Sequence, residues 1–250
     1  MFNWISQIFA VTQVSMRSLP QRKGSSAAAL LGIAGVVAVM VGVLSIAQGV
    51  LKATQSSIGD TNAIVLRSGA DTEMMSGLGG DDTRIISEAP GIAQDESGAI
   101  ASPELFVIIN LPMRSTGTDA NVPLRGVQAP AMKVRESFEL TEGRLFEWGL
   151  NEVIVGVGAQ KQFAGLDIGS SIEVGQEKWP VVGVFEASGG LSESEIWVDA
   201  AVLQPAYRRG NSYQAVYAKL ESGDAFDEFK DSLTSDPRLN VKAMRDSEYY

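Results

Sequence analysis

Three acidic residues, Glu193, Glu195 and Asp199, lie close together and are the side chains best placed for chemistry in this sequence. Closely spaced carboxylates can hold a cation or transfer protons. Their spacing does not match a calcium-binding loop, however. The chain also contains no histidine and no cysteine. Histidine-based acid–base catalysis, Ser-His-Asp triads, thiol nucleophiles and the usual zinc ligand sets are therefore excluded. Carboxylate-only chemistry stays open, but we expect no catalytic residue, no metal and no cofactor.

A glycine pair, Gly156-Val157-Gly158, follows an apolar stretch and precedes a helical one, as in dinucleotide-binding turns. The third glycine of that fingerprint should stand at position 161, which is Lys161. We therefore interpret this segment as a plain strand–turn–helix. Neither a Walker-type phosphate loop nor a Gly-x-Ser-x-Gly elbow is present. Three aromatic residues are interpreted as core rather than as a ligand platform: Trp148, Trp179 and Trp197.

The longest apolar stretch of the chain covers residues 24–51, which include no charged side chain. About 20 helical residues cross the hydrocarbon core of a bilayer, so this stretch predicts a transmembrane helix. A signal peptide cleaved after Ser45-Ile46-Ala47 is the alternative, but signal sequences have shorter apolar regions. Arg17, Arg22 and Lys23 precede the stretch, and such basic flanks place the N-terminus in the cytoplasm.

The residues beyond Lys52 are strongly acidic. They hold all 30 acidic residues and 16 of the 20 basic ones, which leaves a net charge of −14. This balance argues against binding to nucleic acid, which requires a basic surface. Export without cysteine fits a bacterial envelope. We expect a cytoplasmic segment (1–23), a transmembrane helix (24–51) and a periplasmic domain (52–250).

Two features of the N-terminal part predict contacts with the membrane and with other helices. Residues 2–19 form an amphipathic helical pattern that Pro20 ends, which indicates an interfacial helix. Within the transmembrane stretch, small residues recur every three or four positions and predict a face that packs against partner helices. These residues are Gly35, Ala38, Gly42, Ser45 and Gly49.

The periplasmic part predicts an α+β domain of two lobes. Strand–helix–strand patterns at both ends, about 60–112 and 211–246, predict one lobe of βαβ type. A glycine-rich series of short strands between them, about 113–210, predicts an inserted β-rich lobe. Residues 68–82 are interpreted as a flexible polar loop and residues 142–146 as a turn. The segment after Asp199 is expected to be a helix capped by that residue, and residues 224–234 an amphipathic helix.

Several short motifs resemble the MacB/FtsX-type ABC transporter permeases, the group that includes the LolC and LolE subunits. The resemblance rests on the entry into the apolar stretch (22–34), its exit (44–49), and four domain segments (142–146, 151–156, 179–185 and 194–199). It covers nearly the whole chain and depends on the order of the motifs. Permeases of this family carry four spans, with the external domain between the first and second. This chain shows one span and ends at Tyr249-Tyr250, so it resembles a fragment or a one-span variant.

The resemblance implies a non-catalytic permease-type subunit of an ABC export or mechanotransmission system in the bacterial inner membrane. The implied partners are an ABC ATP-binding subunit, a second permease subunit, membrane lipids and a periplasmic adaptor. Two alternatives stay open: a stand-alone anchored binding or scaffold module, and a membrane-tethered enzyme that uses carboxylates.

Overall fold

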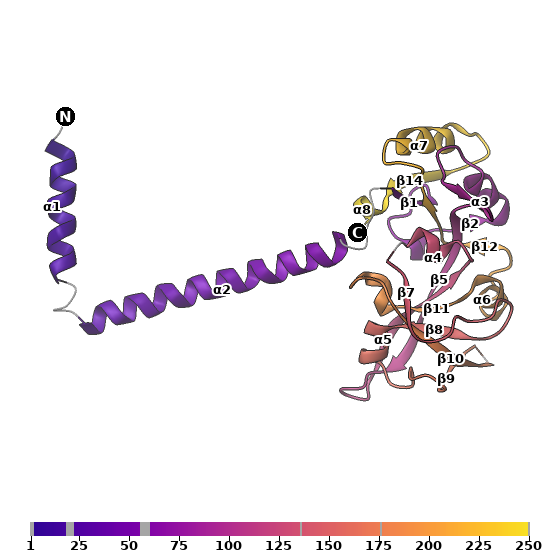
Figure 1. The fold of residues 1–250 in the computed structure, drawn as a ribbon, viewed down its shortest axis with the longest axis horizontal. Coiled ribbons are helices and arrows are strands. Elements are labelled where there is room, and N and C mark those ends of the chain that lie inside the picture. Colours follow the sequence, from indigo (N-terminus) through magenta and orange to yellow (C-terminus); the bar gives the residue numbers. More distant parts are fainter. Residues whose placement is uncertain (1–2, 19–22, 56–60, 136, 176, 250) are drawn as a thin grey trace. The chain divides into compact units, whose positions relative to one another are not determined.

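The computed structural model describes residues 3–18, 23–55, 61–135, 137–175 and 177–249. The chain divides into two compact units, Met1–Leu51 and Lys52–Tyr250. Figure 1 shows the helices of the first unit and the sheet-rich fold of the second. Each unit is described by itself.

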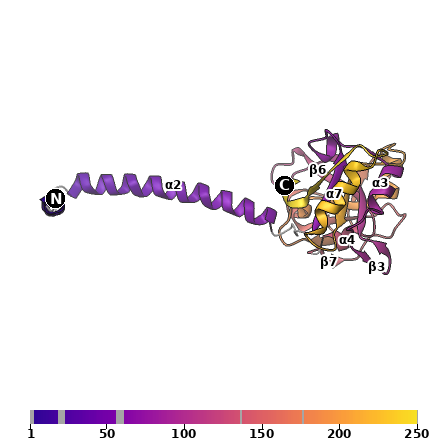
Figure 2. The ribbon, with the colours of Figure 1, turned by 90° about the horizontal axis from the view of Figure 1, so that it is seen from above.

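The N-terminal unit consists of helices α1 (Asn3–Ser18) and α2 (Lys23–Gln55). The helix predicted from the amphipathic pattern is present as α1, while the expected break at Pro20 lies outside the described residues. Figure 2 shows α2 as one uninterrupted helix. Its segment Ala27–Ile46 has a mean hydropathy of 2.6 and no buried residue, so α2 is long and apolar enough to cross a membrane.

The predicted packing face lies along α2. Gly35, Ala38, Gly42 and Ser45 are exposed, and a side chain added at Gly35 or Gly42 would meet no atom within 4 Å. Gly49 belongs to the same helix. The packing face stays a prediction.

A ten-stranded mixed sheet forms the frame of the second unit, in the order β14-β1-β13-β5-β6-β11-β8-β10-β7, with β9 paired to β10. Two pairs are parallel, β10 with β8 and β11 with β6, and the others are antiparallel. The strands are β1 (Asn62–Arg67), β5 (Ala101–Pro112), β6 (Asp119–Val127), β7 (Glu139–Gly143), β8 (Val153–Gly156), β9 (Ser171–Val174), β10 (Glu177–Glu186), β11 (Ile196–Asp199), β13 (Ala215–Lys219) and β14 (Val241–Arg245).

Short elements complete the unit. They are η2 (Glu73–Met75), β2 (Leu78–Gly79), α3 (Gly80–Ser87), β3 (Gln94–Asp95), β4 (Gly98–Ala99), α4 (Ala131–Val134), α5 (Val157–Gln162), η3 (Leu191–Ser194), α6 (Ala200–Ala206), β12 (Ser212–Tyr213), α7 (Ala225–Ser235) and α8 (Asp246–Tyr249). The α+β class predicted from the sequence is confirmed.

The two ends of the domain form interleaved βαβ units. Strand β13 lies between β1 and β5, and β1 lies between β13 and β14. Helices α3 and α7 pack on the same face of these four strands, because Ile86, Phe226 and Phe229 enter one hydrophobic core. The amphipathic helix predicted for residues 224–234 is thus confirmed as α7, with its phenylalanines buried.

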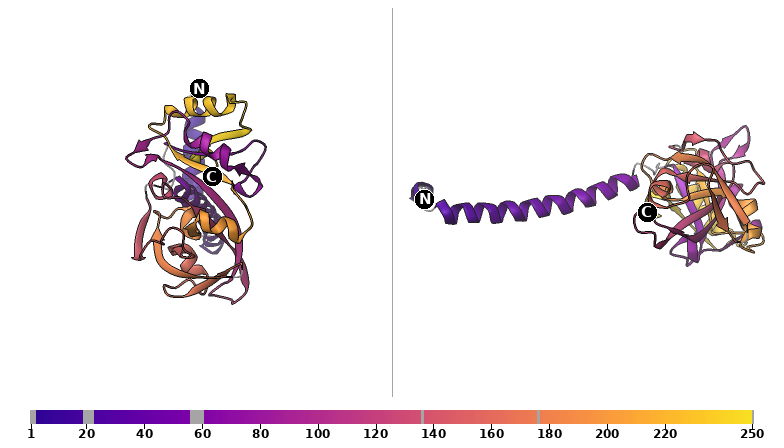
Figure 3. Two further views of the ribbon diagram at one scale, coloured as in Figure 1. Left: turned by 90° about the vertical axis from the view of Figure 1, so that its right-hand side faces the viewer. Right: turned by 90° about the horizontal axis from the view of Figure 1, so that it is seen from below.

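Strand β5 joins the two parts of the sheet. Residues Ala101–Glu104 pair with β13, whereas Leu105–Pro112 pair with β6. A second core follows around β6, β8, β10, β11, α5 and α6. Figure 1 and Figure 3 show α7 with β14 at one end of the domain and β9 with β10 at the other. The lobe boundaries inferred from the sequence stay a prediction.

Most local expectations agree with the structure, and three differ. Helix α6 begins after Asp199, whose Oδ1 accepts a bond from the Ala201 amide at 2.8 Å, as predicted. Residues 142–146 are not a simple turn, because β7 pairs with β10 up to Gly143, where a positive φ ends the strand. Trp148 is not core: it is 44% exposed and packs edge-on against Phe146.

The third difference concerns residues 68–82. This segment contains η2 and β2 instead of a plain loop, and Glu73 within it is buried. Glu73 can be buried because its carboxylate forms an ion pair with Arg125, which lies on a strand far away in the sequence.

Candidate functional site

The register of the central strands gathers charged side chains on one face of the sheet. Arg125 on β6 lies opposite Phe106 on β5 and Trp197 on β11. Side chains alternate along a strand, so Glu104 and Glu195, each two residues away from one of these partners, point to the same face. The sheet therefore brings together charges that lie far apart in the sequence.

Arg125 is the centre of this buried ionic cluster, which consists of Arg125, Arg135, Glu73, Glu104 and Glu195. Its Nε and Nη2 donate to the two oxygens of Glu195 at 2.8 and 2.7 Å. Its Nη1 donates to Glu73 at 2.7 Å and to Glu104 at 3.0 Å. Arg125 is only 1% exposed. A buried guanidinium requires such pairing, since an isolated buried charge is very costly.

Arg135 is the second arginine of the cluster and pairs with Glu104. Its two Nη atoms donate to both oxygens of Glu104 at 2.7 and 2.8 Å, in the bidentate geometry that arginine favours. Its guanidinium also lies over the rings of Trp197 and Tyr217, with the centroids at 4.9 and 4.5 Å. The Tyr217 hydroxyl donates to Glu73. Strands β5, β6 and β13 are thus held to η2 and to the end of α4.

The pair of Arg125 and Glu195 keeps its charges at neutral pH. Burial by itself would raise the pKa of Glu195, but the attraction of Arg125 outweighs it and holds this pKa below its usual range. Burial would likewise lower the pKa of Arg125, and the neighbouring Glu195 and Glu73 raise it instead. The ion pair of Arg125 and Glu195 is therefore present throughout the physiological range.

One carboxylate near the cluster lacks compensation. Asp246, the first residue of α8, is 8% exposed, and burial raises its pKa to about 6. Its Oδ1 atom has no hydrogen-bond partner among the described residues. Tyr249, at the end of the same helix, accepts a bond from the Glu73 amide at 3.0 Å. Helix α8 therefore contacts the cluster at two points.

A pocket of about 340 Å³ lies above the cluster. Its apolar side chains include Met74 and Leu191, which are more than half exposed. This volume is within the range of small-molecule sites. The pocket is lined by Thr72, Glu73, Met74, Phe106, Pro123, Arg125, Leu191, Ser194, Glu195 and Tyr249.

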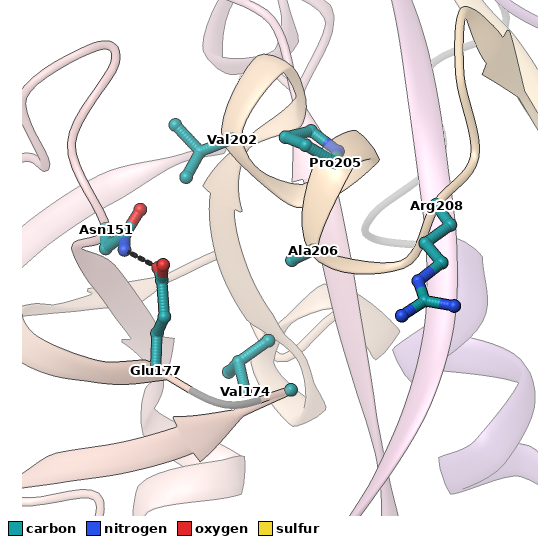
Figure 4. Close-up of a pocket in the computed structure, with 8 residues that line it drawn as sticks. Asn151, Val174, Glu177, Val202, Pro205, Ala206 and Arg208 are labelled. Atoms are coloured by element: carbon teal, nitrogen blue, oxygen red, sulfur yellow. Dashed lines mark hydrogen bonds between the residues drawn. The ribbon is translucent and has the colours of Figure 1, made fainter.

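A larger groove of about 670 Å³ lies between the hairpin of β9 and β10 and helix α6 (Figure 4). The side-chain amide of Asn151 donates to Glu177 across one end of it. The groove is lined by Asn151, Val174, Gly175, Glu177, Val202, Pro205, Ala206 and Arg208. These residues include no pair of acidic groups that could act as acid and base.

The three carboxylates singled out from the sequence have separate roles. Glu193 accepts bonds from the Ala187 and Gly189 amides at 2.8 and 2.7 Å. Glu195 belongs to the ionic cluster, and Asp199 caps α6 and accepts a bond from the Gly149 amide at 2.7 Å. Each carboxylate is occupied by N–H donors of the protein. Within the described residues, no group of three or more acidic side chains could hold a metal ion.

The glycine pair has a packing role. A side chain at Gly156 would come within 2.1 Å of the Glu193 carbonyl oxygen, and one at Gly158 within 3.0 Å of the same atom. The close approach of η3 therefore explains both glycines, and the turn is the plain strand–turn–helix expected from Lys161.

Sequence reasoning missed most of the cluster. Glu104 and Arg125 are charged residues directly beside apolar residues in buried parts of β5 and β6, and this break in the pattern is the signal that could have found them. Glu73, Arg135 and Asp246 lie in short elements or loops, where a charged residue is ordinary. Only the folded sheet shows that they meet.

Comparison with known proteins gives one family. The model described as "MacB-like periplasmic core domain" matches residues 26–236. The fold is similar to the extracellular domain of the noncanonic ABC-type transporter YknZ from Gram-positive bacteria, with 18% identity and a TM-score of 0.54, over 73% of this chain and 99% of that one. It is also similar to the periplasmic region of MacB from Actinobacillus actinomycetemcomitans, with 15% identity and a TM-score of 0.56, over 77% and 92%. No curated protein matches the chain in sequence.

Proposed function

The chain belongs to the family of MacB-like periplasmic core domains, and from this membership we propose that it forms the N-terminal part of a permease-type subunit. The observation that carries the proposal is the extent of the family match. It begins inside the apolar helix α2 and continues through the domain to residue 236. A membrane helix followed by this domain is the arrangement that the proposal requires.

The positions of the first and last strands of the domain support the same proposal. Ala63, at the start of β1, lies opposite Arg245, at the end of β14. The chain therefore enters and leaves the domain at the same place. A domain inserted between two membrane helices needs its ends close together, since short connections must reach both helices.

We further propose that the subunit transmits motion from a separate ATP-binding partner to its external domain. Motion is transmitted well only by a stiff body. The ionic cluster supports this part of the proposal. Arg125 on β6 pairs with Glu104 on β5 and with Glu195 next to β11, and Glu73 connects Arg125 to Tyr217 on β13. A second permease subunit and a periplasmic adaptor are the further partners we expect. We place α2 across the inner membrane and α1 at its cytoplasmic surface, with the N-terminus in the cytoplasm.

The gene locus tests the proposal. We expect the reading frame to encode further apolar spans beyond residue 250, and a neighbouring gene to encode an ATP-binding protein with a Walker-type phosphate loop. A stop codon at that position with no such gene nearby would overturn the permease proposal. The alternative would then be an anchored binding module that uses the pocket beside Met74 and Leu191.

A further inference from the structure

Helix α8 closes the described part of the domain and packs on β1 and β14. Two side chains of α8, those of Asp246 and Tyr249, lie next to the ionic cluster. Asp246 is buried beside the ionic cluster, and the Tyr249 hydroxyl accepts the bond from the Glu73 amide at 3.0 Å. Tyr249 also lines the 340 Å³ pocket. A change in the docking of α8 would therefore alter the wall of this pocket.

Asp246 lies among charges that are already paired. The two guanidinium groups near it, Arg125 and Arg135, donate to the glutamates of the cluster. Glu73 and Glu104 add negative charge. With Asp246 ionised, four carboxylates would face two guanidinium groups. The Oδ1 atom of Asp246 has no hydrogen-bond partner in the part of the chain that the structure describes.

The strands packed against α8 carry three charged side chains, Arg67, Lys242 and Arg245. On β14, Arg245 donates to the Gly223 carbonyl and lies over the Phe226 ring, and Lys242 stands three strand positions from the end. On β1, the Asn62 amide donates to the Val134 carbonyl, and Arg67 donates to the Met75 carbonyl at the other end of the strand. Glu248, on α8 itself, is exposed.

A buried carboxylate with an oxygen that has no hydrogen-bond partner, as Oδ1 of Asp246 has none among the described residues, is costly when ionised and less costly when protonated. We propose that α8 is a pH-dependent latch, which docks firmly when Asp246 is protonated and loosens when Asp246 is ionised. This inference does not depend on the permease proposal, because it concerns only the packing of α8 on its own domain.

The direction of the effect follows from the two states of the latch. Burial raises the pKa of Asp246 in the docked state to about 6, from an ordinary value of 3.8. The stabilising contribution of docking is therefore complete below pH 3.8 and is lost as the pH rises through 6. From the linkage relation, we expect the equilibrium constant for release to rise about tenfold between pH 5 and pH 7.5.

Hydrogen–deuterium exchange of the Glu73 amide tests this proposal, since its acceptor is the Tyr249 hydroxyl. The whole chain would be studied in lipid nanodiscs, with rates corrected for the intrinsic effect of pH. We expect the protection of the Glu73 amide to fall about tenfold from pH 5 to pH 7.5. The amides of α7 serve as an internal control and should show no such fall. Constant protection of the Glu73 amide across this range would overturn the proposal.

Two variants separate Asp246 from other titrating groups. Asp246→Asn removes the charge with little change in shape, and its Glu73 amide should keep a constant protection between pH 5 and pH 7.5. Glu248→Gln removes an exposed carboxylate of the same helix and should keep the pH dependence of the native chain. If Asp246→Asn retains that dependence, another group is responsible and the latch is refuted. If this variant does not fold, the comparison of Glu73 with α7 in the native chain decides alone.

Discussion

Replacing Arg125 with methionine tests whether the ionic cluster holds the domain together. Arg125 is the shared partner of Glu73, Glu104 and Glu195, at 2.7 to 3.0 Å. The change removes the charge but keeps a long side chain. Glu73 and Glu195 would then be buried without a guanidinium, whereas Glu104 would keep Arg135.

The expected loss of stability is large. Removing one partner of a buried ion pair costs about 3–5 kcal/mol, because the other charge stays buried without compensation. Since domains of this kind are stable by only about 5–15 kcal/mol, the variant would lose a large fraction of its free energy of unfolding. Urea unfolding of the whole chain in nanodiscs, followed by the fluorescence of the buried Trp179 and Trp197, measures this loss.

The loss should shrink as the pH falls from 7 to 5. In the native domain, burial would raise the pKa of Glu195, but the attraction of Arg125 holds it below 4.5. Glu195 therefore contributes stability that is present above pH 4.5 and is lost as the pH falls through its lowered pKa. Without Arg125, burial raises this pKa instead, so the variant gains stability on acidification.

Arg84→Met is the matched control. Arg84 pairs with Glu88 at 3.4 Å on an exposed helix face, and both side chains are more than 60% exposed. Such pairs contribute little, so we expect a change of less than about 0.5 kcal/mol. A loss below about 1 kcal/mol for Arg125→Met at pH 7, or a loss that grows with acid, would refute the reasoning.

Two further substitutions test packing and capping in the same unfolding assay. Gly156→Ala should cost about 1–3 kcal/mol, because its Cβ atom would lie 2.1 Å from the Glu193 carbonyl oxygen, whereas Gly77→Ala points into open space and should be nearly neutral. Asp199→Ala should cost about 0.5–2 kcal/mol, since it removes the N-cap of α6 and the bond to the Gly149 amide. Equal stabilities of the two glycine variants, or an unchanged Asp199→Ala variant, would contradict these assignments.

Features that depend on neighbours in the sequence could be predicted. Helix α7 follows from the spacing of Phe226, Phe229 and Leu233, all of which are buried. The cap at Asp199 and the hairpin of β9 and β10 follow from local residues as well. The α+β class follows from the order of these elements.

The ionic cluster could not be predicted in the same way. Arg125 and Glu73 are separated by 52 positions, and only the register of β5, β6 and β11 brings such residues to one face of the sheet. Glu195 illustrates why the partners of a charged residue could not be predicted from the sequence. The sequence left open that Glu195 could help hold a cation, although the spacing does not match a calcium-binding loop. In the structure, Glu195 pairs with the guanidinium of Arg125. Trp148 was misjudged because a tryptophan in a loop gives no local sign of its exposure.

The central claim is that the chain works in a membrane complex with an ATP-binding subunit. The most direct measurement is the amount of ATP-binding protein that co-purifies with the product of this gene when it is tagged at the N-terminus and expressed from its own locus. We expect stoichiometric recovery, and a strong reduction in a Gly42→Leu variant but not in a Leu44→Ile variant, because Gly42 lies on the predicted packing face of α2. Recovery of the membrane-inserted product without any ATP-binding protein would contradict the claim.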